Sequence, residues 1–208
     1  MGIPDTKQKI LDASLLLFNE NGINNVRLQQ IADETGISVG NLAYHFNNKE
    51  AITESLIATV INNIQELLKQ YGKQEPLNDL DFFFKEFYRL CEQYRFFNFD
   101  ILEIKRNFPP SYGQLQPLFN KVKIQLERRF ELFVQERLLQ KEVNIKHLSS
   151  NIWLMMFFMP VEKQISGKMT ATSENQFRKR LWEYVAVYFS AKGATEFALK
   201  IEPEFSGS

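Results

Sequence analysis

The chain has 208 residues, of which 44% are hydrophobic and 24% charged, and its 25 basic and 25 acidic side chains leave no formal net charge. This composition is typical of a folded globular protein with one or two domains. A neutral chain gives no general electrostatic sign of nucleic-acid binding, so such binding requires basic groups focused on one face. The single cysteine, Cys91, excludes an internal disulfide and fits a reducing compartment.

The sequence predicts no membrane span and no signal peptide. Its most apolar stretch, Trp153–Val161, is far shorter than the roughly 20 residues that cross a bilayer. Lys7 and Lys9 are not followed by an unbroken apolar segment, because Asp12 intervenes. We therefore expect a cytoplasmic protein without a membrane partner.

A first helix is predicted from Thr6 to about Gly22, with apolar residues at three- and four-residue spacing. The segment Arg27–Phe46 follows and has the pattern of two short helices joined by a tight turn. Gly36 stands where such a turn needs a positive φ, and Ser38 is placed to cap the second helix. Arg27 is a poor cap for the first of these helices, for which Gln30 can partly substitute.

The second short helix has an apolar side and an open side. Leu42 and Phe46 are four residues apart and point inward, whereas Val39, Asn41 and Tyr44 are left outside. This is the spacing of a helix-turn-helix, whose second helix lies in the major groove of DNA.

The rest of the chain continues the helical pattern, and no segment shows sustained period-two alternation. The expected helices are about 49–71, 78–94, 98–107, 116–141, 144–167, 173–192 and a short tail at 195–200. Pro109, Pro110 and Gly113 are expected to separate two of them, and Gly193 to end the last long one. The fold class is therefore all-α, with nine or ten helices.

The motif and the residues after it, I-A-x-x-T-G-I-S-x-G-N-L-x-Y-H-F-x-x-K-E at 31–50, resemble the DNA-binding headpiece of the TetR family of bacterial repressors. The match covers about residues 6 to 56, and the remainder resembles the family only in its helix pattern. The resemblance implies a headpiece at 1–47 that holds the motif at about 27–46. It also implies an effector-binding and dimerisation domain at 48–208, coupled to the headpiece through helix 49–71.

Eight residues are candidates for DNA contacts, and the resemblance implies the same roles. Hydroxyl, amide and charged groups reach phosphates or base edges, Gly40 permits close approach, and Val39 offers apolar contact. These residues are Arg27, Ser38, Val39, Gly40, Asn41, Tyr44, His45 and Lys49. Two positions depart from the family, which usually has an aromatic residue in place of Ala43 and Ser or Thr in place of Arg27.

Two aromatic segments remain. The residues around Phe82–Phe84 belong either to plain core or, as the resemblance implies, to an effector pocket. The candidate pocket residues are Phe87, Cys91, Phe119, Trp153 and Phe157. The helix around 153–160 is apolar on all sides, and an exposed patch of this kind marks an interface. The resemblance implies that this helix and the last long helix pack against their copies in a four-helix dimer interface, and the alternative is one thick monomeric core. The candidate interface residues are Leu154, Phe158, Leu181, Trp182, Val185 and Phe189.

An enzyme is not expected. His45 and His147 are the only histidines and lie in different predicted domains, and one cysteine gives no metal cluster. The sequence predicts no cofactor and no metal. The best interpretation is a homodimeric, ligand-responsive repressor that binds a double-stranded DNA operator and is released by a small, mainly apolar effector. The alternative is a helical small-molecule or lipid-binding protein without an operator.

Overall fold

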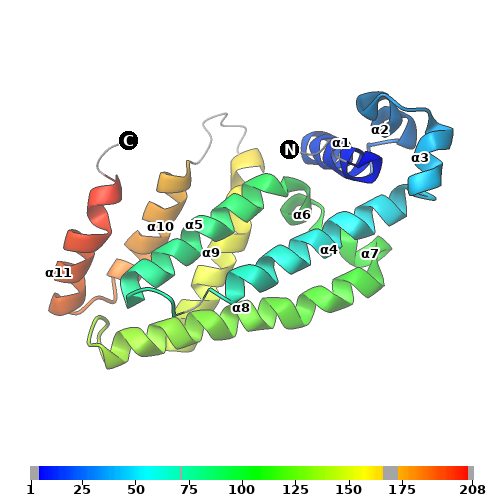
Figure 1. The fold of residues 1–208 in the computed structure, drawn as a ribbon. Helices are drawn as coiled ribbons and strands as arrows, with labels where there is room; N and C mark the ends of the chain where they lie inside the picture. The colour runs from blue at the N-terminus through cyan, green and yellow to red at the C-terminus, as the bar shows by residue number, and fades with distance from the viewer. Residues whose placement is uncertain (1–4, 71, 166–172, 206–208) are drawn as a thin grey trace. The chain divides into compact units, whose positions relative to one another are not determined.

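The computed structural model of the protein describes residues 5–70, 72–165 and 173–205, and within them it contains eleven α-helices, one short 3-10 helix and no strand (Figure 1). The all-α prediction is confirmed. The helices are α1 Thr6–Asn21, α2 Leu28–Thr35, α3 Val39–His45, α4 Lys49–Leu68, α5 Pro76–Gln93, α6 Arg95–Phe99, α7 Ile101–Asn107, α8 Pro109–Gln135, α9 Ile145–Ile165, α10 Glu174–Ala186, α11 Ala191–Lys200 and η1 Glu202–Phe205. None of the helices in these ranges has both the length and the apolar character for crossing a membrane.

The chain divides into two compact units. The first holds the described residues up to Asn62 together with Tyr94–Leu115, and the second holds Asn63–Gln93 with the described residues from Gln116 onward. The first unit is larger than the headpiece expected at 1–47, because α6, α7 and the first part of α4 belong to it. Helices α4 and α8 each have residues in both units.

In the first unit, α1 supplies the central apolar face. Ile10 and Phe18 are buried, and the Phe18 ring lies edge-on to Phe96 of α6, with 6.0 Å between centroids. The backbone N–H of Phe96 donates to the Asn19 side chain over 3.0 Å. An aromatic pair and a capping hydrogen bond thus fix α6 against α1.

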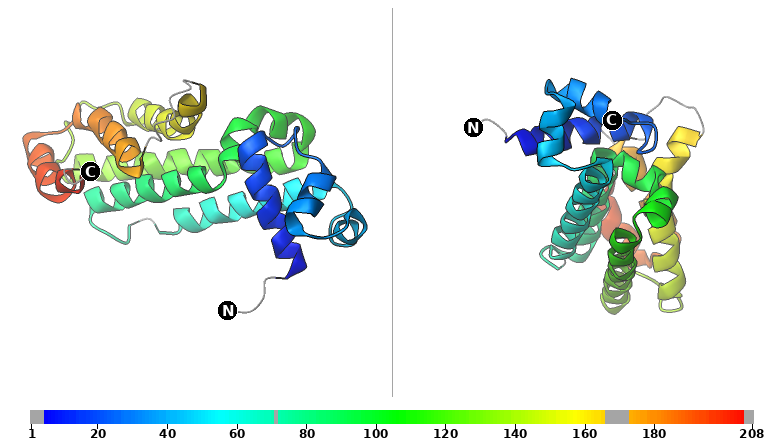
Figure 2. Two further views of the ribbon diagram at one scale, coloured as in Figure 1. Left: turned by 90° about the horizontal axis from the view of Figure 1, so that it is seen from above. Right: turned by 90° about the vertical axis from the view of Figure 1, so that its right-hand side faces the viewer.

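The second unit is built around α5, which packs against α9, α10 and α11 (Figures 1 and 2). Its inward stripe includes Leu80, Phe83, Phe84 and Phe87, all nearly inaccessible to solvent. Trp182 of α10 is fully buried against Phe84, at 5.6 Å between ring centroids. Rings of this size carry most of the hydrophobic free energy of such a core.

Two buried ion pairs anchor α5 to its neighbours. Asp79 accepts from Arg129 Nε of α8 over 2.9 Å, and Asp81 accepts from Arg178 of α10. Asp81 also accepts from Trp182 Nε1 over 2.8 Å. Because each carboxylate is met by several donors, the cost of burying these charges is offset.

Several helix boundaries differ from the sequence prediction for identifiable reasons. Pro109 and Pro110 begin α8 instead of separating helices, since proline fits the first turn, where no intrahelical N–H is needed. The long helix expected at 173–192 ends at Ala186, and Gly193 lies within α11 instead of stopping a helix. A Cβ at Gly193 would be 2.0 Å from the Leu138 carbonyl oxygen, so glycine is there for close packing.

The structure divides the six predicted interface residues into two groups. Leu154 and Phe158 of α9 are 50% and 52% exposed. Leu181, Trp182 and Val185 are fully buried in the protomer's own core, and Phe189 is nearly so. These four side chains offer almost no surface to a second copy, because α5 packs against α10 and the Phe197 ring of α11 packs on Trp182 and Phe189.

Candidate DNA-binding site

The turn between α2 and α3 has the geometry of a helix-turn-helix. Gly36 adopts a left-handed conformation, with φ at 72°, and the N–H of Ile37 closes the turn by donating to the Ala32 carbonyl over 3.0 Å. Ser38 Oγ accepts the N–H of Asn41 over 3.1 Å and so caps α3, as predicted. The first turn of α3 is therefore fixed by the protein itself.

Helix α2 begins with the substitute cap that the sequence indicated. Gln30 Oε1 accepts the backbone N–H of Arg27 over 2.8 Å. The Arg27 side chain makes no capping bond and is exposed, so its guanidinium is free to meet an outside partner.

One side of α3 is open. Leu42 is fully buried, whereas Gly40, Asn41 and Tyr44 are exposed, and the Tyr44 ring is 85% accessible. A Cβ at Gly40 would have only Ser38 Oγ within 4 Å, at 3.9 Å, so the fold itself does not require glycine there.

His45 and Lys49 lie at the end of the motif. The His45 ring is half-buried and packs edge-on against Tyr44, with 5.3 Å between centroids. Lys49 Nζ donates to the carbonyls of Ile23 and Val26 over 2.8 and 2.9 Å, and so holds the loop between α1 and α2. An ammonium group has three N–H donors, which leaves one for a phosphate.

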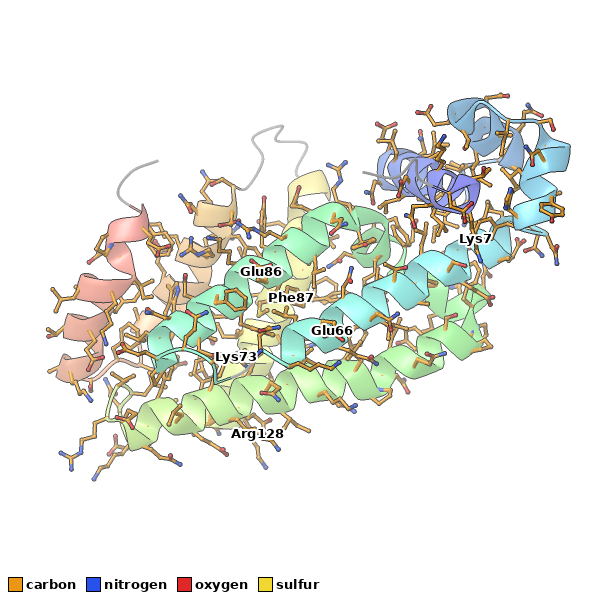
Figure 3. The ribbon with its side chains drawn as sticks, in the orientation of Figure 1. Lys7, Glu66, Lys73, Glu86, Phe87 and Arg128 are labelled. Carbon is orange, nitrogen blue, oxygen red and sulfur yellow. The ribbon has the colours of Figure 1, made fainter. Side chains whose placement is uncertain are left out.

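Two further residues support this surface, and the sequence reasoning missed both. Lys7 lies over the Phe46 ring, with its ammonium 5.4 Å from the centroid, and adds a positive charge near the end of α3 (Figure 3). Asp100 accepts the N–H of Ile23 over 2.8 Å, and so holds the start of the α1–α2 loop, where Lys49 bonds the carbonyl of the same residue. Ile23 and Asp100 are 77 residues apart, so no local sequence pattern indicates that they are in contact.

The predicted pocket residues lie together in the second unit. Trp153 contacts Phe87, Phe119 and Phe157 at centroid distances of 6.0, 5.2 and 5.4 Å, and Cys91 is buried on α5. The rings pack directly on one another, so a ligand among them has to displace at least one ring.

Helix α3 is short, has an open face and is joined to α2 by a capped turn. This arrangement is that of a helix-turn-helix DNA-binding protein. Residues 10–56 match the family model described as bacterial regulatory proteins, tetR family, and residues 61–197 match that of a bacterial transcriptional repressor, TetR. The chain therefore belongs to the TetR family of transcriptional regulators, as the motif indicated.

Individual relatives match over shorter lengths. The HTH-type transcriptional regulator BetI of Yersinia pestis is 28% identical over 76 residues, which are 36% of this chain and 38% of BetI. The regulator RutR of Escherichia coli is 32% identical over 104 residues, 50% of this chain and 42% of RutR. The chain thus matches well under half the length of these curated relatives.

One solved structure aligns with this chain over almost its whole length. A TetR-family transcriptional regulator from Marinobacter aquaeolei superimposes with a TM-score of 0.82 and 22% identity, covering 94% of this chain and 97% of that one. At this identity the likeness shows a shared fold.

Proposed function

We propose that the protein is a homodimeric repressor that binds a double-stranded operator and leaves it when a small effector binds. The observation that carries the DNA-binding step is the exposed face of α3, where Tyr44 is 85% accessible beside Gly40 and Asn41. Asn41 carries an amide that can pair with adenine, and Tyr44 carries a hydroxyl for the sugar-phosphate backbone.

Phosphate contacts come from the flanks of the motif. Arg27 is exposed at the start of α2, and Lys49 retains one N–H donor beside the loop that it holds. Ser38, Val39 and His45 complete the proposed surface. Because the headpiece has few cations, we expect weak non-specific binding and a small number of specific contacts.

The effector step rests on the aromatic cluster around Trp153. Rings from α5, α8 and α9 meet there, and an apolar ligand that displaces one of them changes the packing of three helices. An effector acts by its different affinity for the DNA-bound and free states of the dimer.

The interface of the dimer is proposed on α9 and α10. Leu154 and Phe158 form an exposed apolar strip on α9, and polar pairs flank it: Asn151 donates to Tyr184 over 2.7 Å, and Arg180 pairs with Glu162 over 3.2 Å. An apolar centre with a polar rim is the usual anatomy of an interface.

The test is whether the protein retains a DNA fragment taken from beside its own gene. We expect the protein to shift that fragment at low salt, the Asn41→Ala variant to lose the shift, and the matched variant Asn24→Ala to keep it. Asn24 is exposed in the α1–α2 loop, outside the proposed surface. If the folded protein shifts no upstream fragment, the result favours the alternative, a ligand-binding protein without an operator.

A further inference from the structure

A groove of about 440 Å³ lies in the second unit, between α10, α11 and η1. Its apolar lining is Ala186 from α10, Phe197 from α11 and Phe205 from η1. Because η1 packs against both α10 and α11, the three elements are held together around the groove. The aromatic cluster around Trp153 is built from α5, α8 and α9, and none of its rings is among the described residues that line the groove. The groove is therefore separate from the predicted aromatic pocket.

The two rings of the groove are fixed by partners in the core. Phe197 packs against Trp182 and Phe189, with centroid distances of 5.3 and 5.4 Å. The Arg178 guanidinium, which is buried, lies 5.1 Å from the centroid of the Phe205 ring. A flat apolar group that enters the groove thus meets rings that are already in place, and little side-chain freedom is lost on binding.

The charged residues that line the groove have both signs. Lys179 and Glu183 come from α10 and Glu202 from η1, and all three are exposed. Residues four apart on a helix share a face and lie about 6 Å apart along its axis. Lys179 and Glu183 nevertheless form no ion pair with each other, or with any other group in the part of the chain that the structure describes. Both charges are therefore available to a ligand in the groove.

We propose that this groove binds an aromatic α-amino acid. The ring of the amino acid lies on Phe197 and Phe205. Its carboxylate accepts from the Lys179 ammonium, and its ammonium donates to the Glu183 carboxylate. An α-amino acid carries both charges on one carbon atom, so two long side chains from one helix face can reach them together. The volume fits, since small-molecule sites of proteins measure roughly 300–1,000 Å³.

Charge complementarity selects the zwitterion over its singly charged analogues. An amine without the carboxylate loses the contact with Lys179. An acid without the ammonium loses the contact with Glu183 and is repelled by the carboxylates of Glu183 and Glu202. An amino acid without a ring keeps both charge contacts but loses the apolar burial, which supplies most of the binding free energy. Binding of the amino acid does not depend on the proposed operator.

The test is calorimetric titration of the full chain with L-phenylalanine, 2-phenylethylamine, 3-phenylpropionate and L-alanine. The amine and the acid each keep the ring and one of the two charges. We expect L-phenylalanine to bind about threefold to fivefold more tightly than either of them, since one exposed charge contact contributes up to about fivefold. L-alanine should bind at least about tenfold more weakly than L-phenylalanine, because it lacks the ring.

Two variants remove one charge contact each. With Lys179→Gln, L-phenylalanine should bind no more tightly than 2-phenylethylamine. With Glu183→Gln, 3-phenylpropionate should come within about twofold of L-phenylalanine. The matched variants Lys146→Gln and Glu131→Gln change exposed charges outside the groove and should keep both preferences.

Three outcomes overturn the proposal. The first is no binding of L-phenylalanine at about 10 mM, and the second is equal binding of L-phenylalanine and 2-phenylethylamine by the unchanged protein. The third is a preference for L-phenylalanine over the amine that survives in Lys179→Gln with native helical circular dichroism, because the carboxylate then has another partner. Operator retention without amino acid tests the proposed function separately, so failure of one is distinguishable from failure of the other.

Discussion

Asp100 Oδ2 accepts the backbone N–H of Ile23 over 2.8 Å, and this hydrogen bond joins the loop after α1 to the junction of α6 and α7. Asp100 is the N-cap residue of α7, yet its side chain makes no bond to that helix. Burial raises the pKa of the Asp100 carboxyl, the Ile23 N–H lowers it, and the charge of Glu103 raises it further. The net shift is upward, so ionised Asp100 is a cost to the folded state.

This pKa shift predicts a pH dependence. A carboxyl whose pKa is higher in the folded than in the unfolded chain binds more protons when folded, so its contribution to stability falls as pH rises from the unfolded value toward the raised one. Asp100→Asn keeps an oxygen acceptor for Ile23 without the charge. We expect this variant to melt at a higher temperature than the unchanged protein at pH 7, and to lose less stability than that protein as the pH rises from about 4 to about 7. Thermal melts across this range measure both effects.

The matched comparison is Asp100→Ala. This variant leaves the Ile23 N–H without its acceptor, and we expect a loss of about 1–3 kcal/mol. Glu54→Gln, at an exposed position of α4, controls for the removal of one negative charge. If Asp100→Asn melts below the unchanged protein at every pH, then the charge stabilises the junction and the argument from burial is wrong.

Local chemistry explains why the headpiece motif was predictable. The positive φ of Gly36, the Ser38 cap and the bond between Gln30 and Arg27 each involve residues within a few positions of one another. Turn and cap preferences act at this range, so one sequence is enough to infer them. After α10 ends at Ala186, the chain instead bonds a remote segment, where the Leu138 carbonyl accepts the N–H of Ser190.

Other features could not be predicted from the sequence. The apolar stripe of Leu181, Trp182 and Val185 packs in the protomer's own core, and such a stripe looks the same in sequence as one that faces a partner. Asp81 and Arg178 are 97 residues apart, and the second role of Lys49 needs carbonyls 23 and 26 residues away. Contacts of this range are set by tertiary packing.

Lys49→Ala is expected to have two effects, because the ammonium holds the α1–α2 loop and keeps one donor for a phosphate. The melting temperature should fall, and binding should weaken similarly for all DNA sequences, with the slope of log K against log salt reduced by about 1. Lys69→Ala, at an exposed position directly after α4, is the control. A variant that changes base preference with an unchanged salt slope contradicts the phosphate contact.

Replacing glycine by alanine should change the stability of the protein in opposite directions at two helical positions. At Gly193 a Cβ would be 2.0 Å from the Leu138 carbonyl oxygen, and we expect Gly193→Ala to cost about 1–3 kcal/mol through overpacking. At Gly113, inside α8, the added Cβ meets no atom within 4 Å apart from its chain neighbours and the helix's own adjoining backbone. Gly113→Ala should therefore stabilise the protein by up to about 1 kcal/mol, since alanine favours helix. Urea denaturation compares them, and equal effects would refute the packing argument.

The buried cluster of Asp81, Arg178 and Trp182 predicts a large loss on truncation. Asp81→Ala leaves the Arg178 guanidinium, which is 2% exposed, without its carboxylate in the core, and we expect a cost of about 3–5 kcal/mol. Glu204 is 55% exposed and also accepts from Arg178, so Glu204→Ala should cost less. Arg180→Ala breaks only an exposed pair with Glu162 and should cost under about 1 kcal/mol. Equal losses for the three variants, measured by urea denaturation, would contradict this order.

Phe158 provides the sharpest test of the proposed dimer. Its ring is 52% exposed on α9, one turn from Leu154, and Phe158→Glu places a charge at the centre of the proposed interface, where desolvating it is costly. Sedimentation should show a dimer of the 24.5 kDa chain and a monomer for this variant at micromolar concentration. Leu102→Glu, at a 62% exposed position on α7, should remain dimeric. A monomer for the unchanged protein would remove the paired half-site arrangement, because two headpieces must be linked to read two half-sites about one helical turn apart.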